Sequence, residues 1–198
     1  QVALIGAINK ALDLDLTIGQ IANKAWEIES QINYTGKQDH YAAAYGGANI
    51  MNFTHKVTIQ SLSKEPIELL IPSLVLFNTG LPHKKNIQGG FKKLERSQRI
   101  ALDRIKEFAL ESIGLINRGD YKAVGELMHE AWRYKKLSNK GVTNTYIDDF
   151  YHHALKHGAY GGKVLGSGGG GFMLFVIDPT KRKEFIKKMT QRGLEWWD

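Results

Sequence analysis

The order of predicted elements over the second half of the chain favours an α+β fold, a sheet with helices packed on one face. A short apolar run at residues 74–77 predicts a strand, and helical periodicity dominates residues 91–157. Two further apolar runs, residues 164–165 and 172–176, predict strands joined by a glycine-rich loop. A basic helix over residues 181–189 follows them. Elements in this order are typical of an α+β sandwich.

The first part of the chain also alternates between helical and strand patterns. Apolar residues recur at helical spacing over residues 2–12. Thr17 is placed to cap a second helix at residues 18–32. A strand is expected at residues 48–53, and residues 59–70 are expected to contain strand edges and a turn at their proline.

Three helices are predicted between the strand at residues 74–77 and the glycine-rich loop, at residues 91–117, 121–137 and 145–157. Asp120 is placed to cap the second of them. Glycines 158, 161 and 162 are expected to close the third helix. A last strand is expected to begin near residue 194.

The charge of the chain suits an anionic ligand. The net charge is +7, and nucleic acid, membrane surfaces and phosphorylated small molecules would all complement it. The basic residues are scattered, however, and none of their clusters carries the interleaved aromatic residues that stack on single-stranded bases. We therefore expect no nucleic-acid partner. No run approaches the ~18 apolar residues of a membrane span, and no signal peptide is visible, so a cytoplasmic protein is expected.

Residues 163–176 read KVLGSGGGGFMLFV, and their glycines have two interpretations. In a ligand-contacting loop, glycine lets backbone N–H groups approach a bound group, and N–H groups turned inward form a concave anion site. In a linker or an ordinary hairpin, the same run would only be flexible. Because linkers are not normally embedded between apolar strands, and a tight hairpin needs only one or two glycines, the ligand-contacting loop is favoured.

Asp39 lies in a second glycine-bounded stretch, residues 36–47, which reads GKQDHYAAAYGG. One interpretation is an N-cap whose carboxylate accepts a backbone N–H of the following turn. The other is a general base or an electrostatic anchor, with Lys37 close enough to stabilise the charged carboxylate. The local sequence leaves both interpretations open.

Glu27 and Glu29 lie near the end of the predicted helix at residues 18–32. The helix dipole disfavours carboxylates at that end. Solvated surface acids are the ordinary interpretation, whereas a bound cation would offset the unfavourable placement.

The two glycine-bounded stretches, about 130 residues apart and in this order, resemble the GHMP kinases, which include the galactose, homoserine, mevalonate and phosphomevalonate kinases. They look most like the branch that phosphorylates C1 of a heptose 7-phosphate. LFNTG at residues 76–80 and HEAWRYKK at residues 129–136 extend the resemblance over the chain. It implies a ferredoxin-like C-terminal domain at residues 73–198, joined to the remainder of an N-terminal domain at residues 1–72, with the site between them.

The resemblance also implies a site. Asp39 would accept the proton of the sugar C1 hydroxyl, and Glu29 matches the acidic Mg²⁺ ligand of mevalonate kinase-like members. ATP is the implied phosphoryl donor, and a sugar phosphate is the implied acceptor. The implied substrate contacts are Lys37, Gln38, Gly166, Ser167, Gly168, Gly169, Gly170 and Gly171. The candidate cations for the sugar phosphate group are Lys37, Lys84, Lys85, Arg133, Lys135 and Lys136.

Three alternatives remain beside this interpretation. One is a GHMP kinase for an unphosphorylated hexose or deoxyhexose such as fucose, and another is a non-catalytic GHMP-like sensor. The third is a basic ferredoxin-like RNA-binding module, although the predicted strands lack paired exposed aromatic residues. The Gly/Ser-rich ATP-binding loop of the family would precede a helix resembling residues 2–12. That loop is not present in this sequence, which opens on Gln1, so we expect the chain to be part of a longer protein.

Overall fold

The computed structural model describes residues 1–32, 35–82 and 94–197. The chain divides into two compact units, Gln1–Lys64 and Glu65–Asp198. The domain boundary predicted from the sequence lies eight residues later, after the short helix α4 (Lys64–Leu70) instead of at its start. None of the helices described here is long and apolar enough to cross a membrane.

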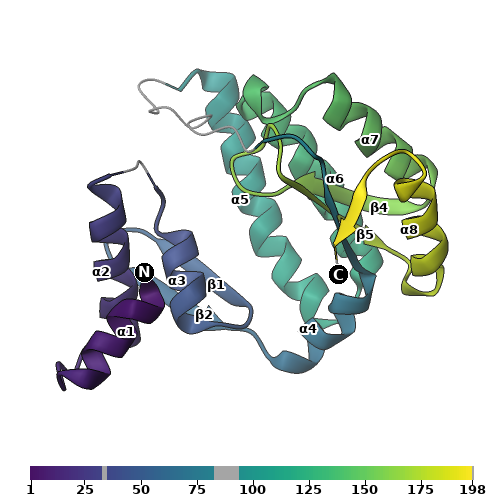
Figure 1. Cartoon of the computed structure of the whole chain (residues 1–198). Coiled ribbons are helices and arrows are strands. Elements are labelled where there is room, and N and C mark those ends of the chain that lie inside the picture. The colour runs from purple at the N-terminus through teal and green to yellow at the C-terminus, as the bar shows by residue number, and fades with distance from the viewer. Residues whose placement is uncertain (33–34, 83–93, 198) are drawn as a thin grey trace. The chain divides into compact units, whose positions relative to one another are not determined.

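The first unit consists of three helices and a two-stranded antiparallel hairpin (Figure 1). Its elements are α1 (Val2–Ala11), α2 (Ile18–Ser30), α3 (Gln38–Tyr45), β1 (Asn49–Phe53) and β2 (Val57–Ser61).

Local signals explain where α2 begins and how it packs. The Thr17 side chain accepts a hydrogen bond from the Gln20 backbone N–H, and the Gln20 side chain accepts one from the Thr17 backbone N–H, which forms a capping box. The predicted cap is therefore confirmed. Ala22 and Ala25 are fully buried, so that small side chains allow neighbouring segments to pack closely against α2.

The second unit contains a four-stranded antiparallel sheet in the order β4-β5-β3-β6. Strand, helices, strand, strand, helix and strand follow one another along the chain, which is the ferredoxin-like connectivity. The predicted α+β class is confirmed. After α4, the elements are β3 (Leu74–Asn78), α5 (Arg96–Asn117), α6 (Tyr121–Ser138), α7 (Thr145–Lys156), β4 (Ala159–Val164), β5 (Phe172–Ile177), α8 (Arg182–Thr190) and β6 (Glu195–Trp197).

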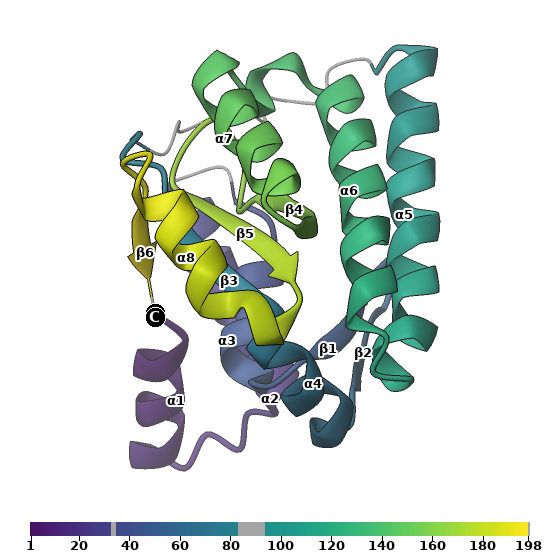
Figure 2. The same cartoon turned by 90° about the vertical axis from the view of Figure 1, so that its right-hand side faces the viewer.

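Helices α7 and α8 lie over one face of the sheet (Figure 2). Aromatic side chains form the centre of the core between the sheet and these helices. Phe77 of β3 and Phe175 of β5 are fully buried. Both contact Phe185 of α8 with ring centroids 6.1 Å apart, and Tyr151 of α7 lies 5.9 Å from Phe175. The sheet therefore provides a rigid base for the loop that joins β4 to β5.

Two expectations about turns are wrong. Gly161 belongs to β4 and does not close the preceding helix, because α6 packs directly on it: a Cβ atom there would lie 2.0 Å from the Gly125 carbonyl oxygen. Gly162 is in the same strand. Pro66 does not form a turn but lies in the first turn of α4, where the missing N–H of proline is tolerated.

Candidate active site

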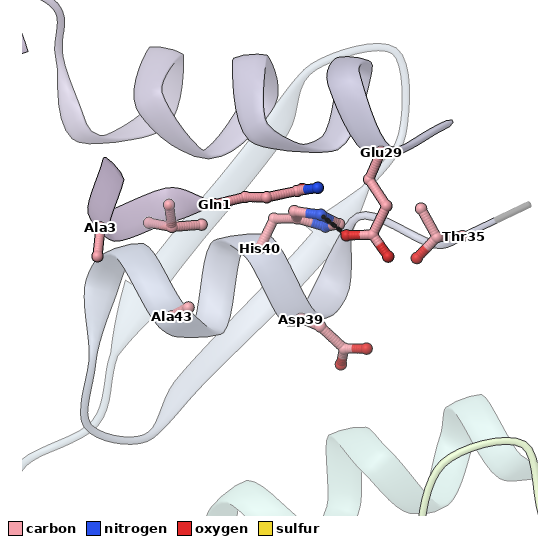
Figure 3. A pocket seen from close by; sticks show the side chains of 8 residues that line it. Gln1, Ala3, Glu29, Thr35, Asp39, His40 and Ala43 are labelled. Atoms are coloured by element: carbon pink, nitrogen blue, oxygen red, sulfur yellow. Dashed lines mark hydrogen bonds and ion pairs between the residues drawn. The ribbon is translucent and has the colours of Figure 1, made fainter. Parts of the chain in front are cut away.

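Helices α2 and α3 bring the two predicted acidic site residues to one pocket of about 380 Å³ in the first unit (Figure 3). Glu29 comes from the last turn of α2, and Asp39 comes from the first turn of α3. The residues that line the pocket are Gln1, Val2, Ala3, Glu29, Thr35, Asp39, His40 and Ala43.

Asp39 is not a helix cap. Helix α3 begins at Gln38, its N-cap residue is Lys37, and the cap makes no side-chain hydrogen bond. The Asp39 side chain is exposed and leaves α3 in a different direction from His40 (Figure 3). In residues 1–32, 35–82 and 94–197 its carboxylate has no hydrogen-bond or ion-pair partner. The N-cap interpretation is therefore wrong, and a carboxylate is left available to a ligand.

Glu29 is not a solvated surface acid. Its side chain is 36% exposed, and its Oε2 lies 2.8 Å from Nε2 of His40. His40 is only 5% exposed. In the amide orientation that satisfies both of its side-chain atoms, Gln1 donates a second hydrogen bond to the same Oε2 at 3.2 Å. The carboxylate is thus held by N–H groups on one oxygen.

The predicted contact between Lys37 and Asp39 is not found. The Lys37 amine donates to Oδ1 of Asn23 at 2.9 Å and lies 4.1 Å from the centre of the Trp26 ring. A cation over an indole face is stabilised by the ring quadrupole, so Lys37 serves to join α2 to the start of α3. Gln38, the first residue of α3, is exposed.

The glycine loop between β4 and β5 is a packed structure and not a flexible linker. Four of its residues have positive φ angles, 65° at Gly166, 92° at Gly168, 77° at Gly169 and 82° at Gly171. Side chains are disfavoured at such angles. A Cβ atom on Gly170, whose φ angle is ordinary, would lie 2.5 Å from the Pro82 carbonyl oxygen. The linker interpretation is therefore wrong.

Two N–H groups of this loop are used within the protein. The Gly169 N–H donates to the Val142 carbonyl at 2.8 Å, and the Gly171 N–H donates to the Leu81 carbonyl at 3.0 Å. The Gly171 carbonyl accepts bonds from the N–H and the hydroxyl of Thr79, both at 2.8 Å. The expectation that the loop N–H groups point toward a ligand is therefore wrong for residues 169 and 171.

Most of the HEAWRYKK segment serves packing and intramolecular pairing. Nδ1 of His129 lies 2.9 Å from the Tyr151 hydroxyl, and burial lowers the pKa of this histidine. Trp132 is 2% exposed and belongs to the core. Arg133 pairs with Glu130 at 3.0 Å, and Lys136 pairs with Asp148 at 3.1 Å. The two cations are thus neutralised within the chain.

Lys135 is the cation of this segment that has no acidic partner in the part of the chain that the structure describes. Burial lowers the pKa of its amine. Lys163 of β4 also has a lowered pKa, first through desolvation and then through the charge of Lys135, although the residue is exposed to solvent. Lys163, three residues before Gly166, is not among the site residues predicted from the sequence. Lys84 and Lys85 lie outside the described residues.

Glu29 and Asp39 are the two carboxylates of this pocket that could contact a cation. Among the described residues no group of three or more His, Cys, Asp and Glu side chains could hold a metal ion. Mg²⁺ usually takes only one or two carboxylates and completes its octahedron with water and substrate phosphates. Glu29, with Oε2 held by His40, keeps a second oxygen for such a role, and Asp39 lines the same pocket.

The chain is similar to known proteins over most of its length. Residues 112–194 match the family model described as GHMP kinases C terminal. The D-glycero-alpha-D-manno-heptose 7-phosphate kinase of Campylobacter jejuni is 33% identical to this chain over 205 residues, 95% of this chain and 58% of that protein.

Solved structures give the same relationship. A D-glycero-D-manno-heptose 1-phosphate kinase from Bacteroides thetaiotaomicron superposes with a TM-score of 0.75 at 26% identity, covering 99% of this chain and 56% of that one. Mevalonate kinase from L. major shares the fold, with a TM-score of 0.73 at 18% identity over 99% of this chain and 62% of that one. The chain spans little more than half the length of these relatives. The matched residues, the fold and the similarity along the chain together show that the chain contains a GHMP kinase C-terminal domain.

Proposed function

We propose that the intact protein is an ATP-dependent sugar kinase that phosphorylates the anomeric C1 hydroxyl of a heptose 7-phosphate. The observation that carries the proposal is the pair of carboxylates in one pocket, Asp39 without a protein partner in the described ranges and Glu29 held by His40. The similarity to the heptose 7-phosphate kinase of Campylobacter jejuni supports this choice of substrate.

Asp39 is the proposed general base. In the reaction the C1 oxygen attacks the γ-phosphorus of ATP, the bond from that phosphorus to the bridging oxygen breaks, and ADP leaves. The hydroxyl proton passes to the Asp39 carboxylate. An anomeric hydroxyl is more acidic than an ordinary alcohol, which helps a carboxylate to accept its proton. No other group in the described residues engages the Asp39 carboxylate, so it is free to approach a substrate hydroxyl.

Glu29 is the proposed Mg²⁺ ligand. When bound, Mg²⁺ neutralises charge on the phosphates of ATP during transfer. The proposed role of Glu29 is to present a carboxylate oxygen to the cation in a fixed orientation. The hydrogen bond from His40 to Oε2 restricts that orientation. A bound cation would offset the unfavourable interaction of this carboxylate with the dipole at the C-terminal end of α2.

Residues beside the base and in the glycine loop are the proposed substrate contacts. Gln38 is exposed beside Asp39. In the loop, the internal bonds of Gly169 and Gly171 fix the backbone. The remaining proposed contacts are Lys37, Gly166, Ser167, Gly168 and Gly170. Their role would be to shape the surface that the sugar contacts.

A phosphate group is the proposed ligand of the lysines in the second unit. The charge of Lys135 contributes to the lowered pKa of Lys163, and neither amine has an acidic partner in the described ranges. A doubly charged phosphate would neutralise both amines.

Small phosphorylated molecules, and not nucleic acid or a membrane, are therefore the proposed partners, and the cytoplasm, where ATP is available, is the proposed location.

The test is a substrate comparison with the intact protein, ATP and Mg²⁺. Heptose 7-phosphate, heptose 1-phosphate, unphosphorylated heptose and fucose are offered separately, and the phosphorylated carbon of the product is assigned by NMR. The proposal expects turnover with heptose 7-phosphate and a new phosphate at C1. Faster turnover of a sugar without phosphate would contradict the substrate assignment, and binding without turnover of all four would favour a sensor.

A further inference from the structure

His40 is a buried polar side chain that the proposed reaction does not use directly. It is 5% exposed, follows Asp39 in the first turn of α3, and directs Nε2 at Oε2 of Glu29 (Figure 3). Its other ring nitrogen, Nδ1, is buried and has no hydrogen-bond partner in the described part of the chain. Such an unsatisfied atom is uncommon in a folded protein and calls for an explanation.

The surroundings of the two ring nitrogens favour one tautomer. A carboxylate oxygen at 2.8 Å accepts a hydrogen bond, so Nε2 carries a proton and donates. A second proton on Nδ1 would be a buried donor without an acceptor, which is costly. Nε2 is therefore the ring nitrogen that donates to Glu29.

We propose that His40 is a positioning residue that fixes the Glu29 carboxylate through its Nε2–H donor, so that the second carboxylate oxygen is presented to a divalent cation. The inference rests on the proposed role of Glu29. Donors that orient the carboxylate ligands of a metal are a general device for pre-organising metal sites.

Two substitutions separate orientation from simple packing. In His40→Gln, the side-chain nitrogen lies the same number of bonds from Cα as Nε2 of histidine, so the donor to Glu29 is kept. In His40→Asn, the nitrogen is one bond closer to Cα, in the place of Nδ1, so the donor to Glu29 is lost. Both variants introduce a neutral amide, and each is compared with Glu29→Gln, which removes the carboxylate itself.

The measurement is the dissociation constant of Mn²⁺ in the ternary complex of the intact protein with a non-hydrolysable ATP analogue, followed by electron paramagnetic resonance. We expect Mn²⁺ to bind roughly tenfold more weakly to His40→Asn and within about threefold of wild type to His40→Gln, as for partners of metal ligands in general. Thermal melting of each variant accompanies the measurement.

Unchanged Mn²⁺ affinity in His40→Asn would overturn the inference, and so would equal weakening in both variants that parallels their loss of melting temperature. If His40→Asn does not fold, the Mn²⁺ affinity of His40→Gln is the test. An affinity near that of wild type supports the positioning role of His40, and a lost affinity contradicts it. The Glu29→Gln variant tests the proposed metal role of Glu29 independently of the positioning role of His40. Equal affinity in wild type and Glu29→Gln would remove Glu29 from the site, whereas weaker binding to Glu29→Gln with no effect of His40→Asn refutes positioning alone.

Discussion

Alanine substitutions in the glycine loop test whether its close contacts hold the β4–β5 connection in place. Gly168 has a φ angle of 92°, and a Cβ atom there would lie 2.7 Å from the Val142 carbonyl oxygen. Gly170 has an ordinary φ angle, but its Cβ atom would lie 2.5 Å from the Pro82 carbonyl oxygen. Both obstacles are backbone atoms, which cannot rotate away as the end of a side chain can.

A third glycine of the same unit supplies the matched control. Gly193 has a φ angle of 90°, and a Cβ atom added there would meet no described atom within 4 Å. Gly193→Ala should therefore cost only the left-handed backbone strain, about 1 kcal/mol. Gly170→Ala should cost only the close contact, about 1–3 kcal/mol. Gly168→Ala combines the two effects and should lower the free energy of unfolding by about 2–4 kcal/mol.

The assay is urea denaturation of the intact protein, with the free energy of unfolding taken from the midpoint at constant slope. The order Gly168→Ala, Gly170→Ala, Gly193→Ala, from most to least destabilised, is expected. If Gly168→Ala lowers the free energy of unfolding no more than Gly193→Ala does, the close contact with Val142 does not contribute to stability. The loop would then be loosely held, contrary to its hydrogen bonds.

Three further predictions concern charged side chains. Glu29→Gln should raise the Mg²⁺ concentration for half-maximal activity roughly tenfold, whereas Glu27→Gln, at the same helix end, should leave it unchanged; equal responses would remove Glu29 from the metal site. Lys135→Met and Lys163→Met should each raise the KM for the phosphorylated sugar roughly tenfold, the value of one charged hydrogen bond, and an unchanged KM would exclude a phosphate contact. Because burial lowers the pKa of both amines in the folded state, the unfolded chain binds more protons. The free energy of unfolding should therefore rise as the pH increases through the lowered pKa values. Affinity for the phosphorylated sugar should fall over the same pH range, and the Met variants should lose both pH dependences.

Much of the fold follows from local sequence. The side chains of Thr17 and Asp120 cap helices as predicted, since each is a short acceptor directly before a periodic apolar segment. The apolar run at residues 74–77 forms β3, one residue longer than predicted. Signals of this kind need no knowledge of distant contacts.

Features set by distant contacts were not predictable in the same way. Gly161 has the local appearance of a helix terminator, but the approach of α6 requires a residue without a side chain in β4. Gly169 and Gly171 have the appearance of free donors, but the carbonyls that accept from them lie far away in sequence, at Val142 and Leu81.

The candidate site also combines residues that local sequence predicts with contacts that it does not predict. Asp39 and Glu29 were selected from their motif and helix positions, and both line one pocket. The contact between His40 and Glu29 joins two helices, so no periodicity or spacing pointed to it. Lys163 reads in sequence as an ordinary strand residue beside the glycines. It stands out only once α6 and β4 are seen to bring Lys135 near it.

The most direct test of the proposed function is the rate of sugar phosphorylation by Asp39→Asn in the intact protein. Asparagine keeps the size of the side chain and removes the proton acceptor, and the lost interaction with the helix dipole should change stability by less than about 1 kcal/mol. The control is Glu184→Gln, which removes a charge from the first turn of α8. General base catalysis predicts that kcat falls by roughly 10²–10⁴ in Asp39→Asn, with the rate of Glu184→Gln unchanged. A rate for Asp39→Asn within a few-fold of wild type, in a protein that melts at the same temperature, would contradict the assignment of Asp39 as the base.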